Sequence, residues 1–259
     1  MSIIRRFFRF WYLFYVSIGL LTAIIILFVL ALFSLVLPNR TRGNFLYATS
    51  RMAARFLFWC WGIRVDRMVE SPLSNQQAYI FVFNHISYLD ALILLLAVGD
   101  RPFRGLGKEE MASIPIFGYL YRSTVIMVKR TDAIDRARSV DDLKSTLRDN
   151  ISIALAPEGT FNMTGAPLLP FFDGAFRIAL QTQTQVCPML ILDAYDRMHY
   201  GSVFSLKPGL LRIRLLSPID PMINGEETTV EALKKRTYDI MHEKLIEFNA
   251  SWIQPEHAR

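Results

Sequence analysis

A long stretch without any charged residue, close to the start of the chain, is the strongest constraint on how this protein folds. Trp11 to Leu37 is almost entirely apolar. As an α-helix it would be about 40 Å long, more than the roughly 30 Å of a bilayer's hydrocarbon core. It is also longer than the apolar region of a signal peptide, and no small-x-small cleavage pattern follows it. We therefore expect a retained membrane segment.

The distribution of charge supports a membrane rather than a nucleic acid as partner. The net charge is +6, yet residues 1–65 carry eight arginines and no Asp, Glu or Lys, while the rest of the chain is slightly acidic. A nucleic-acid-binding protein would carry its basic residues on the folded domain. Here they bracket the apolar run, which suits anionic lipid headgroups. We expect membrane lipids as partners and no nucleic acid.

A second amphipathic segment follows, from Asn44 to Arg64. Its tryptophans and arginines are typical of the headgroup level of a membrane, although a helix packed on a soluble body would fit as well. Arginines flank both ends of the first apolar run, so the positive-inside rule selects no direction. A single tilted span and a helix pair that enters the cytoplasmic leaflet and returns both remain open. We expect residues 1–70 to form membrane-associated helices and residues 71–259 the main domain.

From residue 77 onward, strand-like and helix-like patterns alternate. Apolar runs rich in β-branched and aromatic residues predict strands at Ala78–Phe83, Thr124–Val128, Ser152–Ala156, Gln185–Leu192 and Leu210–Leu216. Helical patterns cover Ala91–Val98, Lys108–Tyr121, Ile134–Asp149, Gly174–Thr182 and a C-terminal stretch from Glu227 to Trp252. Strands separated by helices indicate an α/β fold with a mixed, largely parallel sheet flanked by helices.

The connection that follows the first of these strands carries a candidate catalytic pair. Asn84-His85 comes directly after the strand, and Ser87 and Asp90 resemble the start of a helix, with Ser87 as N-cap. On one continuous helix, His85 and Asp90 would point about 140° apart. With His85 in the loop, the carboxylate can reach the imidazole and leave its other nitrogen free as a base. The alternative is a plain helix cap beside a loop histidine.

Four further stretches stand near strand ends. Lys108 leads into a predicted helix, Arg130 ends a strand, Pro157-Glu158-Gly159-Thr160 follows another, and Val186-Cys187-Pro188 begins the next. Taken singly, each is an ordinary loop charge, turn or strand stop. Two of them, Arg130 and the turn Pro157–Thr160, place charged groups just past the end of a strand, as Asn84-His85 does. Because the carboxyl ends of parallel strands meet at one edge of a sheet, we expect these two groups to converge there with His85.

Taken together and in this order, these blocks resemble those of the lysophospholipid acyltransferases, the NHxxxxD glycerolipid acyltransferases that include 1-acyl-glycerol-3-phosphate acyltransferase. The NHxxxxD block is matched by Asn84, His85 and Asp90, and the arginine block by Arg130. The Pro-Glu-Gly-Thr block and the Val-x-Pro turn match the stretches ending in Thr160 and Pro188. The similarity covers about residues 76–192.

The resemblance implies transfer of an acyl group from acyl-CoA or acyl carrier protein to the hydroxyl of a lysophospholipid, above all 1-acyl-glycerol-3-phosphate, at the cytoplasmic side of the inner membrane. His85 would be the base and Asp90 its orienting partner, with no cofactor, no metal and no covalent acyl-enzyme. The substrate-binding residues implied are Asn84, Lys108, Arg130, Glu158, Gly159, Thr160 and Pro188. Backbone amides near Asn84 or the Val-x-Pro turn would supply the oxyanion donors.

Two departures from the family pattern bear on the acceptor. Phe161 stands where the family commonly has Arg after Glu-Gly-Thr, and Asp173 stands where it usually has Lys. A phosphomonoester favours several cations, so an acceptor with another headgroup is an alternative, unless other basic residues compensate. Those candidates are Lys108, Arg122, Lys129 and Arg130.

Other classes of function find less support. A Gly-x-Ser-x-Gly elbow is missing, which argues against a serine lipid hydrolase. Cys187 lies in an apolar strand-like run, so we expect a buried structural thiol rather than a nucleophile, and the two cysteines indicate no disulfide framework. His199, His242 and His257 lack metal-ligand spacing. A non-catalytic membrane lipid-binding protein remains the alternative that needs no chemistry.

Overall fold

The computed structural model describes residues 3–113, 117–128, 133–223 and 226–257. Its helices are α1 (Ile3–Ser34), α2 (Asn39–Cys60), α3 (Asp90–Ala97), α4 (Phe117–Thr124), α5 (Ala133–Arg148), α6 (Gly174–Thr182), α7 (Ala194–Arg197) and α8 (Val230–Glu247). The strands are β1 (Ile63–Val69), β2 (Ile80–Phe83), β3 (Phe103–Lys108), β4 (Val125–Val128), β5 (Ser152–Leu155), β6 (Val186–Ile191), β7 (Gly209–Leu215), β8 (Met222–Ile223) and β9 (Glu226–Glu227).

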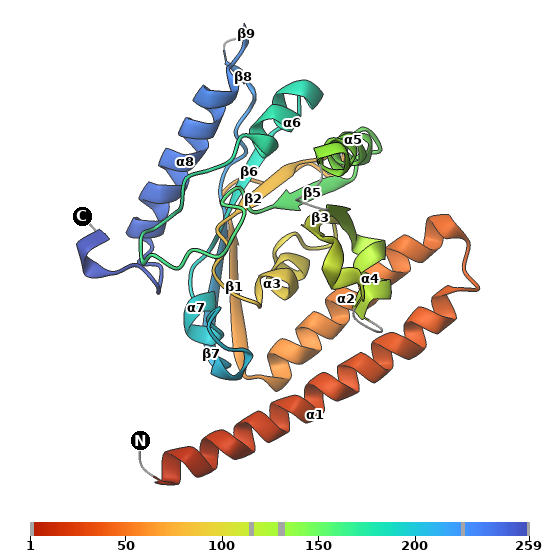
Figure 1. The fold of residues 1–259 in the computed structure, drawn as a ribbon, viewed down its shortest axis with the longest axis vertical. Helices are drawn as coiled ribbons and strands as arrows, with labels where there is room; N and C mark the ends of the chain where they lie inside the picture. The colour runs from red at the N-terminus through yellow and green to blue at the C-terminus, as the bar shows by residue number, and fades with distance from the viewer. Residues whose placement is uncertain (1–2, 114–116, 129–132, 224–225, 258–259) are drawn as a thin grey trace.

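A seven-stranded sheet with the order β1-β7-β6-β2-β5-β3-β4 forms the centre of the molecule (Figure 1). β2 pairs in parallel with β5 and β6, β3 pairs in parallel with β4 and β5, and β1 in parallel with β7. Only the β6–β7 pair among these is antiparallel. The predicted α/β class with a largely parallel sheet is thus confirmed.

The middle of the sheet forms the core because helices cover both of its faces. Every residue of β2, β5 and β6 is buried. Helix α6 packs against β2 and α8, α8 packs against β6, and α5 packs against β4 and β5. These three helices lie on one side of the sheet, whereas α2 and α3 lie together on the other (Figure 1). Strands buried on both faces read as continuous apolar runs, which is why they were predictable.

The two N-terminal helices lie side by side outside this body, with α1 farthest from the sheet (Figure 1). The Arg42 side chain donates hydrogen bonds to the carbonyls of Ser34, Leu35 and Leu37, and so satisfies groups at the end of α1 that lack helical partners. In the described part of the chain, α1 is the one helix long and apolar enough to cross a membrane. Many of its large apolar side chains are exposed, as are Met52 and Trp59 of α2.

One predicted helix needs correction, and two strands were missed. The predicted helix Lys108–Tyr121 is wrong: Lys108 ends strand β3, a 3₁₀ turn follows at Glu109–Ser113, and α4 begins at Phe117. Pro115 within that stretch lacks the amide hydrogen that a continuous helix needs. Strands β1 and β3 were not predicted. Because β1 forms an edge of the sheet, the sheet begins before residue 71, and the division of the chain at that residue stays a prediction.

Candidate active site

Two loops meet at the carboxyl edge of the sheet, one after β2 and one after β5. The strands are parallel neighbours, with Val82 opposite Leu155, so the chain leaves both at the same edge. The backbone amide of His85 donates to Glu158 Oε1 over 2.9 Å, and the Asn162 amide donates to the His85 carbonyl over 2.9 Å. Both backbone groups of His85, its amide and its carbonyl, therefore form hydrogen bonds with the loop after β5.

His85 and Asp90 meet as predicted. Nδ1 of His85 lies 2.7 Å from Oδ2 of Asp90, the first residue of α3. The same oxygen accepts from the amides of Ile86 and Ser87 over 3.0 and 3.1 Å, so the loop wraps around the carboxylate. Asp90 is 2% exposed, and the described residues offer its Oδ1 no hydrogen-bond partner. A buried carboxylate that accepts from Nδ1–H selects one tautomer of the imidazole.

The other ring nitrogen of His85, Nε2, is not engaged by Asp90. The His85 side chain is 30% exposed, and within the described ranges no protein group hydrogen-bonds Nε2. In the tautomer that Asp90 favours, Nε2 carries the free lone pair. The pair can therefore accept a proton from a hydroxyl group at Nε2 while the carboxylate stabilises the resulting imidazolium.

Ser87 does not act as the N-cap that the sequence predicted. Helix α3 begins at Asp90 with Leu89 at the cap position, and Ser87 Oγ accepts from the Leu89 amide over 3.0 Å instead. The Ser87 hydroxyl also donates to the carbonyl of Met198, and Ser87 pairs with His199 in an isolated β-bridge. Ser87 thus connects the loop between β2 and α3, which carries His85, to the segment after α7.

Glu158 is buried under the loops, with 2% of its surface exposed. Oε1 accepts from the His85 amide, and Oε2 accepts from the Leu169 amide over 2.8 Å. Burial raises the pKa of Glu158 from 4.5 to about 7, although the two backbone amides act in the opposite direction. Both oxygens are occupied by protein groups, so Glu158 positions the His85 loop; the predicted contact with substrate stays a prediction.

Asn84 has a similar structural position. Its side-chain amide donates to the Ile191 carbonyl over 3.0 Å, and its side-chain oxygen accepts from the Ile191 amide over 2.9 Å. The side chain is 1% exposed and extends the contact between β2 and β6 by one residue. Asn84 therefore attaches the start of the loop that carries His85 to the end of the neighbouring strand β6.

The turn after β5 requires a glycine. Gly159 has a φ of +70°, and a Cβ there would lie 2.8 Å from the ring of Phe172. Thr160, the next residue, is exposed at the site and available to a ligand. The ring of Phe161 lies 4.2 Å from that of His85, measured between centroids. The residue that departs from the family pattern thus lies directly against the His85 ring.

An aromatic cluster extends from this ring, and the sequence analysis missed it. Phe161 contacts Tyr88 edge-to-face at 5.1 Å and stacks near Tyr200 at 6.3 Å. Tyr200 in turn contacts Tyr195 and His199. No short-range spacing signals this cluster, because its members come from three segments that are distant in the sequence. It makes the wall beside His85 apolar and aromatic rather than cationic.

Of the remaining predicted binding residues, the structure describes Pro188 fully, Lys108 only in its backbone, and Arg130 not at all. Arg130 and Lys129 lie outside the described residues; β4, which precedes them, is parallel to β3 and runs to the same edge of the sheet as β2. Lys108 is the last residue of β3, and the structure does not describe its side chain. The predicted turn at Pro188 is wrong: the residue is buried inside β6, opposite Val82 of β2. Val186–Pro188 therefore offers no turn amides for an oxyanion.

Two other residues behave as ordinary structure. Asp173 forms an ion pair with Lys234 of α8 at 2.7 Å, and this partner lowers the pKa of its carboxyl group. Lys234 thus brings a cation next to the position where the family usually has lysine. Cys187 is buried, and burial raises the pKa of its thiol to about 12, as expected of a structural cysteine. Groups of three potential metal ligands are absent from the described residues.

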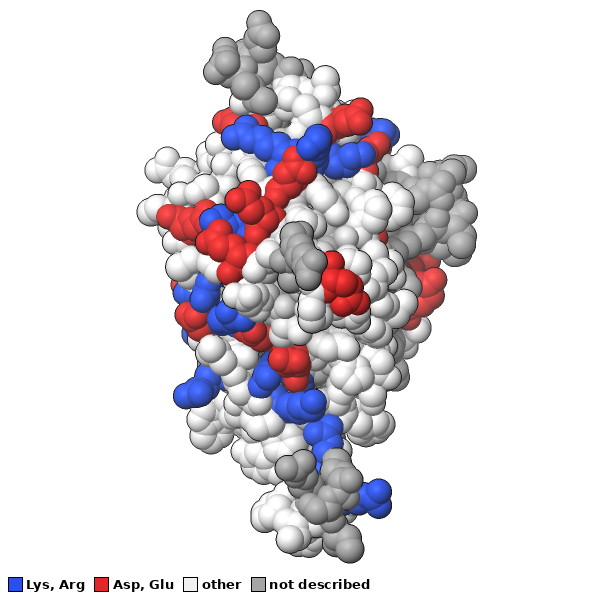
Figure 2. Space-filling view, turned by 90° about the vertical axis from the view of Figure 1, so that its left-hand side faces the viewer, with Lys and Arg blue, Asp and Glu red and all other residues white. Residues whose placement is uncertain are grey.

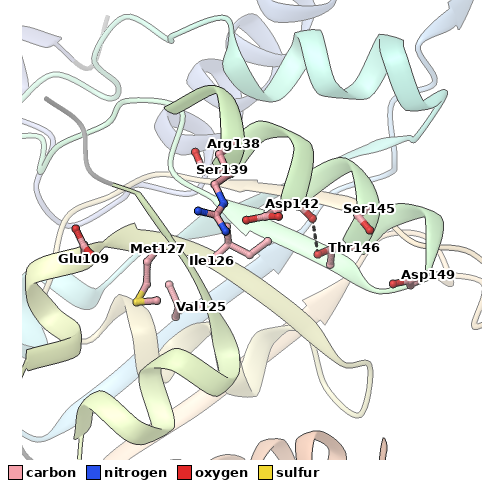
Figure 3. A pocket seen from close by; sticks show the side chains of 10 residues that line it. All are labelled: Glu109, Val125, Ile126, Met127, Arg138, Ser139, Asp142, Ser145, Thr146 and Asp149. Carbon is pink, nitrogen blue, oxygen red and sulfur yellow. Dashed lines mark hydrogen bonds between the residues drawn. The ribbon is translucent and has the colours of Figure 1, made fainter. Parts of the chain in front are cut away.

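A cavity of about 570 Å³ lies between β4 and α5 (Figure 3). Its wall is polar along the helix and apolar along the strand. Thr146 donates a hydrogen bond to the Asp142 carbonyl over 2.8 Å on the helix side. The lining residues are Glu109, Val125, Ile126, Met127, Arg138, Ser139, Asp142, Ser145, Thr146 and Asp149. None of them is a predicted site residue.

Comparison with known proteins shows similarity to one family of acyltransferases. Residues 64–192 match the family model described as Acyltransferase. A curated 1-acyl-sn-glycerol-3-phosphate acyltransferase from Cocos nucifera is 29% identical over 184 residues, covering 70% of this chain and 57% of that protein. One from Escherichia coli K12 is 24% identical over 251 residues, covering 95% of this chain and 98% of that protein.

The plant relatives are longer proteins, and the matched region spans less than two thirds of their length. Among solved structures, the crystal structure of the 1-acyl-sn-glycerophosphate acyltransferase PlsC from Thermotoga maritima superposes with a TM-score of 0.77 at 21% identity. The superposition covers 96% of this chain and 100% of that one, so the two share a fold.

Proposed function

Residues 64–192 place the chain in the Acyltransferase family, and we propose that it is a membrane-bound enzyme that transfers a fatty acyl group from a thioester to a lysophospholipid hydroxyl. The donor is acyl-CoA or acyl carrier protein, and the preferred acceptor is 1-acyl-glycerol-3-phosphate, which gives phosphatidic acid. The observation that carries the proposal is the 2.7 Å contact between Nδ1 of His85 and the buried Asp90, which leaves Nε2 without a hydrogen-bond partner among the described residues.

In the proposed reaction, Nε2 of His85 removes the proton from the acceptor hydroxyl. The oxygen attacks the thioester carbonyl directly, and collapse of the tetrahedral intermediate forms the ester and breaks the carbon–sulfur bond. The imidazolium then returns the proton to the thiolate. Asp90 holds the ring in one orientation and stabilises its charged form, because its carboxylate accepts from Nδ1 throughout.

The acceptor's glycerophosphate part would lie against the turn Gly159-Thr160 and near Arg130. A bidentate arginine suits a phosphate, and the exposed Thr160 offers a hydroxyl. Glu158 would contribute by positioning, since its oxygens are occupied. The aromatic ring of Phe161 beside His85 specifically favours the second candidate, an acyltransferase for a lysolipid with fewer negative charges.

The proposed location is the cytoplasmic side of the inner membrane. The exposed apolar surface of α1 would enter the bilayer and bring the sheet edge close to substrates that live there. Both cysteines are free and buried, which is compatible with a reducing compartment.

A panel assay tests the proposal. Purified full-length protein in detergent micelles is given lysolipids with phosphate, choline, ethanolamine or glycerol headgroups, each with acyl-CoA and with acyl carrier protein thioester. We expect ester product and stoichiometric free thiol with 1-acyl-glycerol-3-phosphate as the best acceptor. A better neutral or zwitterionic acceptor would select the second candidate. Lipid binding without ester formation from any pair would indicate a non-catalytic lipid-binding protein.

A further inference from the structure

A short 3₁₀ turn, Val203–Ser205, presents two large apolar side chains to solvent. Val203 is 55% exposed and Phe204 is 70% exposed. Side-chain hydrogen bonds hold the turn: Ser202 Oγ accepts from the Phe204 amide over 3.1 Å, and Ser205 Oγ donates to the Ser202 carbonyl over 2.6 Å. Ser205 Oγ also accepts from the His199 amide over 3.0 Å. The turn is built to hold these side chains outward.

The turn is attached to the N-terminal end of α1. The Arg9 side chain donates to the carbonyls of Phe204 and Leu206, which holds the turn against the first turns of α1, where Phe7, Phe8 and Trp11 are exposed. Arg6 and Arg9 lie near the N-terminal end of α1, and guanidinium groups are costly in hydrocarbon. This end therefore lies at headgroup level whether α1 spans the bilayer or the pair of helices α1 and α2 enters one leaflet and returns. The turn therefore lies at headgroup level as well.

The same segment continues into the candidate active site. The Met198 carbonyl accepts from the Ser87 hydroxyl, and His199 forms a β-bridge with Ser87. Tyr200 lies 6.3 Å from Phe161, whose ring contacts His85. Residues 198–206 thus connect the loop that carries His85 to the N-terminal end of α1.

The charges around the turn are those that an anionic surface attracts. Arg9, whose side chain contacts the turn, and the exposed Lys207 flank it in space and in the sequence. On the face shown in Figure 2, the charged atoms toward the lower end, where α1 begins, belong to Lys and Arg, whereas Asp and Glu lie higher. Basic residues beside exposed apolar side chains are typical of a contact with anionic lipid.

We propose that Val203 and Phe204 insert into the headgroup region of an anionic phospholipid bilayer and form a second membrane contact, separate from α1. This contact holds the His85 edge of the sheet against the lipid surface, so the acceptor reaches Nε2 without crossing water. The second statement rests on the proposed function, whereas the membrane contact does not.

Quenching by brominated lipids measures the contact directly. Phe204→Cys, labelled with a thiol-reactive fluorophore in the full-length protein, is reconstituted in vesicles containing phosphatidylglycerol with brominated acyl chains. Cys60 and Cys187 are buried, so the new thiol takes the label. Met222→Cys is the matched control, an exposed apolar position on β8 at the end of the molecule opposite α1 (Figure 1). We expect quenching at 204 and little at 222; a label at 204 that is quenched no more than one at 222 overturns the proposal.

An activity pair tests the consequence for catalysis. Phe204→Asp should lower acyl transfer to a long-chain lysolipid in vesicles by about tenfold or more, because an apolar anchor is lost, and leave transfer to a short-chain monomeric acceptor unchanged. Met222→Asp should change neither. Equal losses on both acceptors would assign the turn to the chemistry and overturn the proposed role. Quenching at 204 in a protein without any transferase activity would refute the proposed function and leave the membrane contact standing.

Discussion

Glu158 links the pH dependence of stability to the geometry of the catalytic loop. Burial raises its pKa from 4.5 to about 7 in the folded protein. Because the folded state binds this proton more tightly than the unfolded chain, the contribution of Glu158 to the free energy of unfolding is full below about pH 4.5. It is lost as the pH rises to about 7. At 1.36 kcal/mol for each pKa unit, the loss is about 3 kcal/mol.

The substitution Glu158→Gln isolates this effect. Glutamine does not titrate, so the variant should lack this part of the pH dependence. Its NH₂ group would also face one of the two backbone amides, of His85 or Leu169, that the carboxylate accepts from. A buried amide left without an acceptor costs about 1–3 kcal/mol, so the variant should be less stable at pH 5.

Denaturant unfolding of both proteins in the same detergent, between pH 4.5 and 8, measures the difference in the free energy of unfolding. We predict that the free energy of unfolding of the unmodified protein, relative to that of Glu158→Gln, falls by about 3 kcal/mol between pH 4.5 and 7. Above pH 7 the difference between the two proteins should stay constant. Glu256→Gln, at an exposed carboxylate near the C-terminus, should follow the unmodified protein at every pH. A difference that does not vary with pH would refute the argument from burial.

Three further substitutions test the site. Asp90→Asn removes the charge beside Nδ1 and should lower kcat by about 10²- to 10⁴-fold with little change in KM; steady-state kinetics with an unchanged kcat would contradict the pair. Gly159→Ala places a Cβ at a φ of +70° and should cost about 1–2 kcal/mol of stability, and an unaltered midpoint in thermal unfolding would argue against that backbone constraint. Phe161→Arg should raise kcat/KM for 1-acyl-glycerol-3-phosphate relative to a zwitterionic lysolipid by about tenfold, as a guanidinium favours phosphate, and an unchanged ratio would place the headgroup elsewhere.

The central strands were predictable because each is buried on both faces and reads as an apolar run. β1 was not, because most of it is exposed at the sheet edge and it carries Arg64, Asp66 and Arg67. β3 was missed because its sequence Phe-Arg-Gly-Leu-Gly-Lys has two glycines and two charges, which weaken any strand pattern. Position at the edge of the sheet decided the first case, and the composition of the strand decided the second.

The contact between His85 and Asp90 was predictable because the two residues are five positions apart, at the start of one helix, so the local sequence determines it. Its catalytic role stays a prediction. The role of Glu158 depends on amides far from it in the chain, and the contact between Ser87 and Met198 joins residues 111 positions apart. Local patterns carry no record of such contacts. The family pattern singled out Phe161 as a departure, but its position against the His85 ring follows only from the fold.

The His85→Ala variant tests the central claim most directly. Full-length protein with this change should express, associate with membranes and unfold like the unmodified protein, while acyl transfer falls to the level without enzyme. His257→Ala, at an exposed histidine outside the site, should transfer at the normal rate. If His85→Ala retains a substantial fraction of the transfer rate under the same conditions, His85 is not the base.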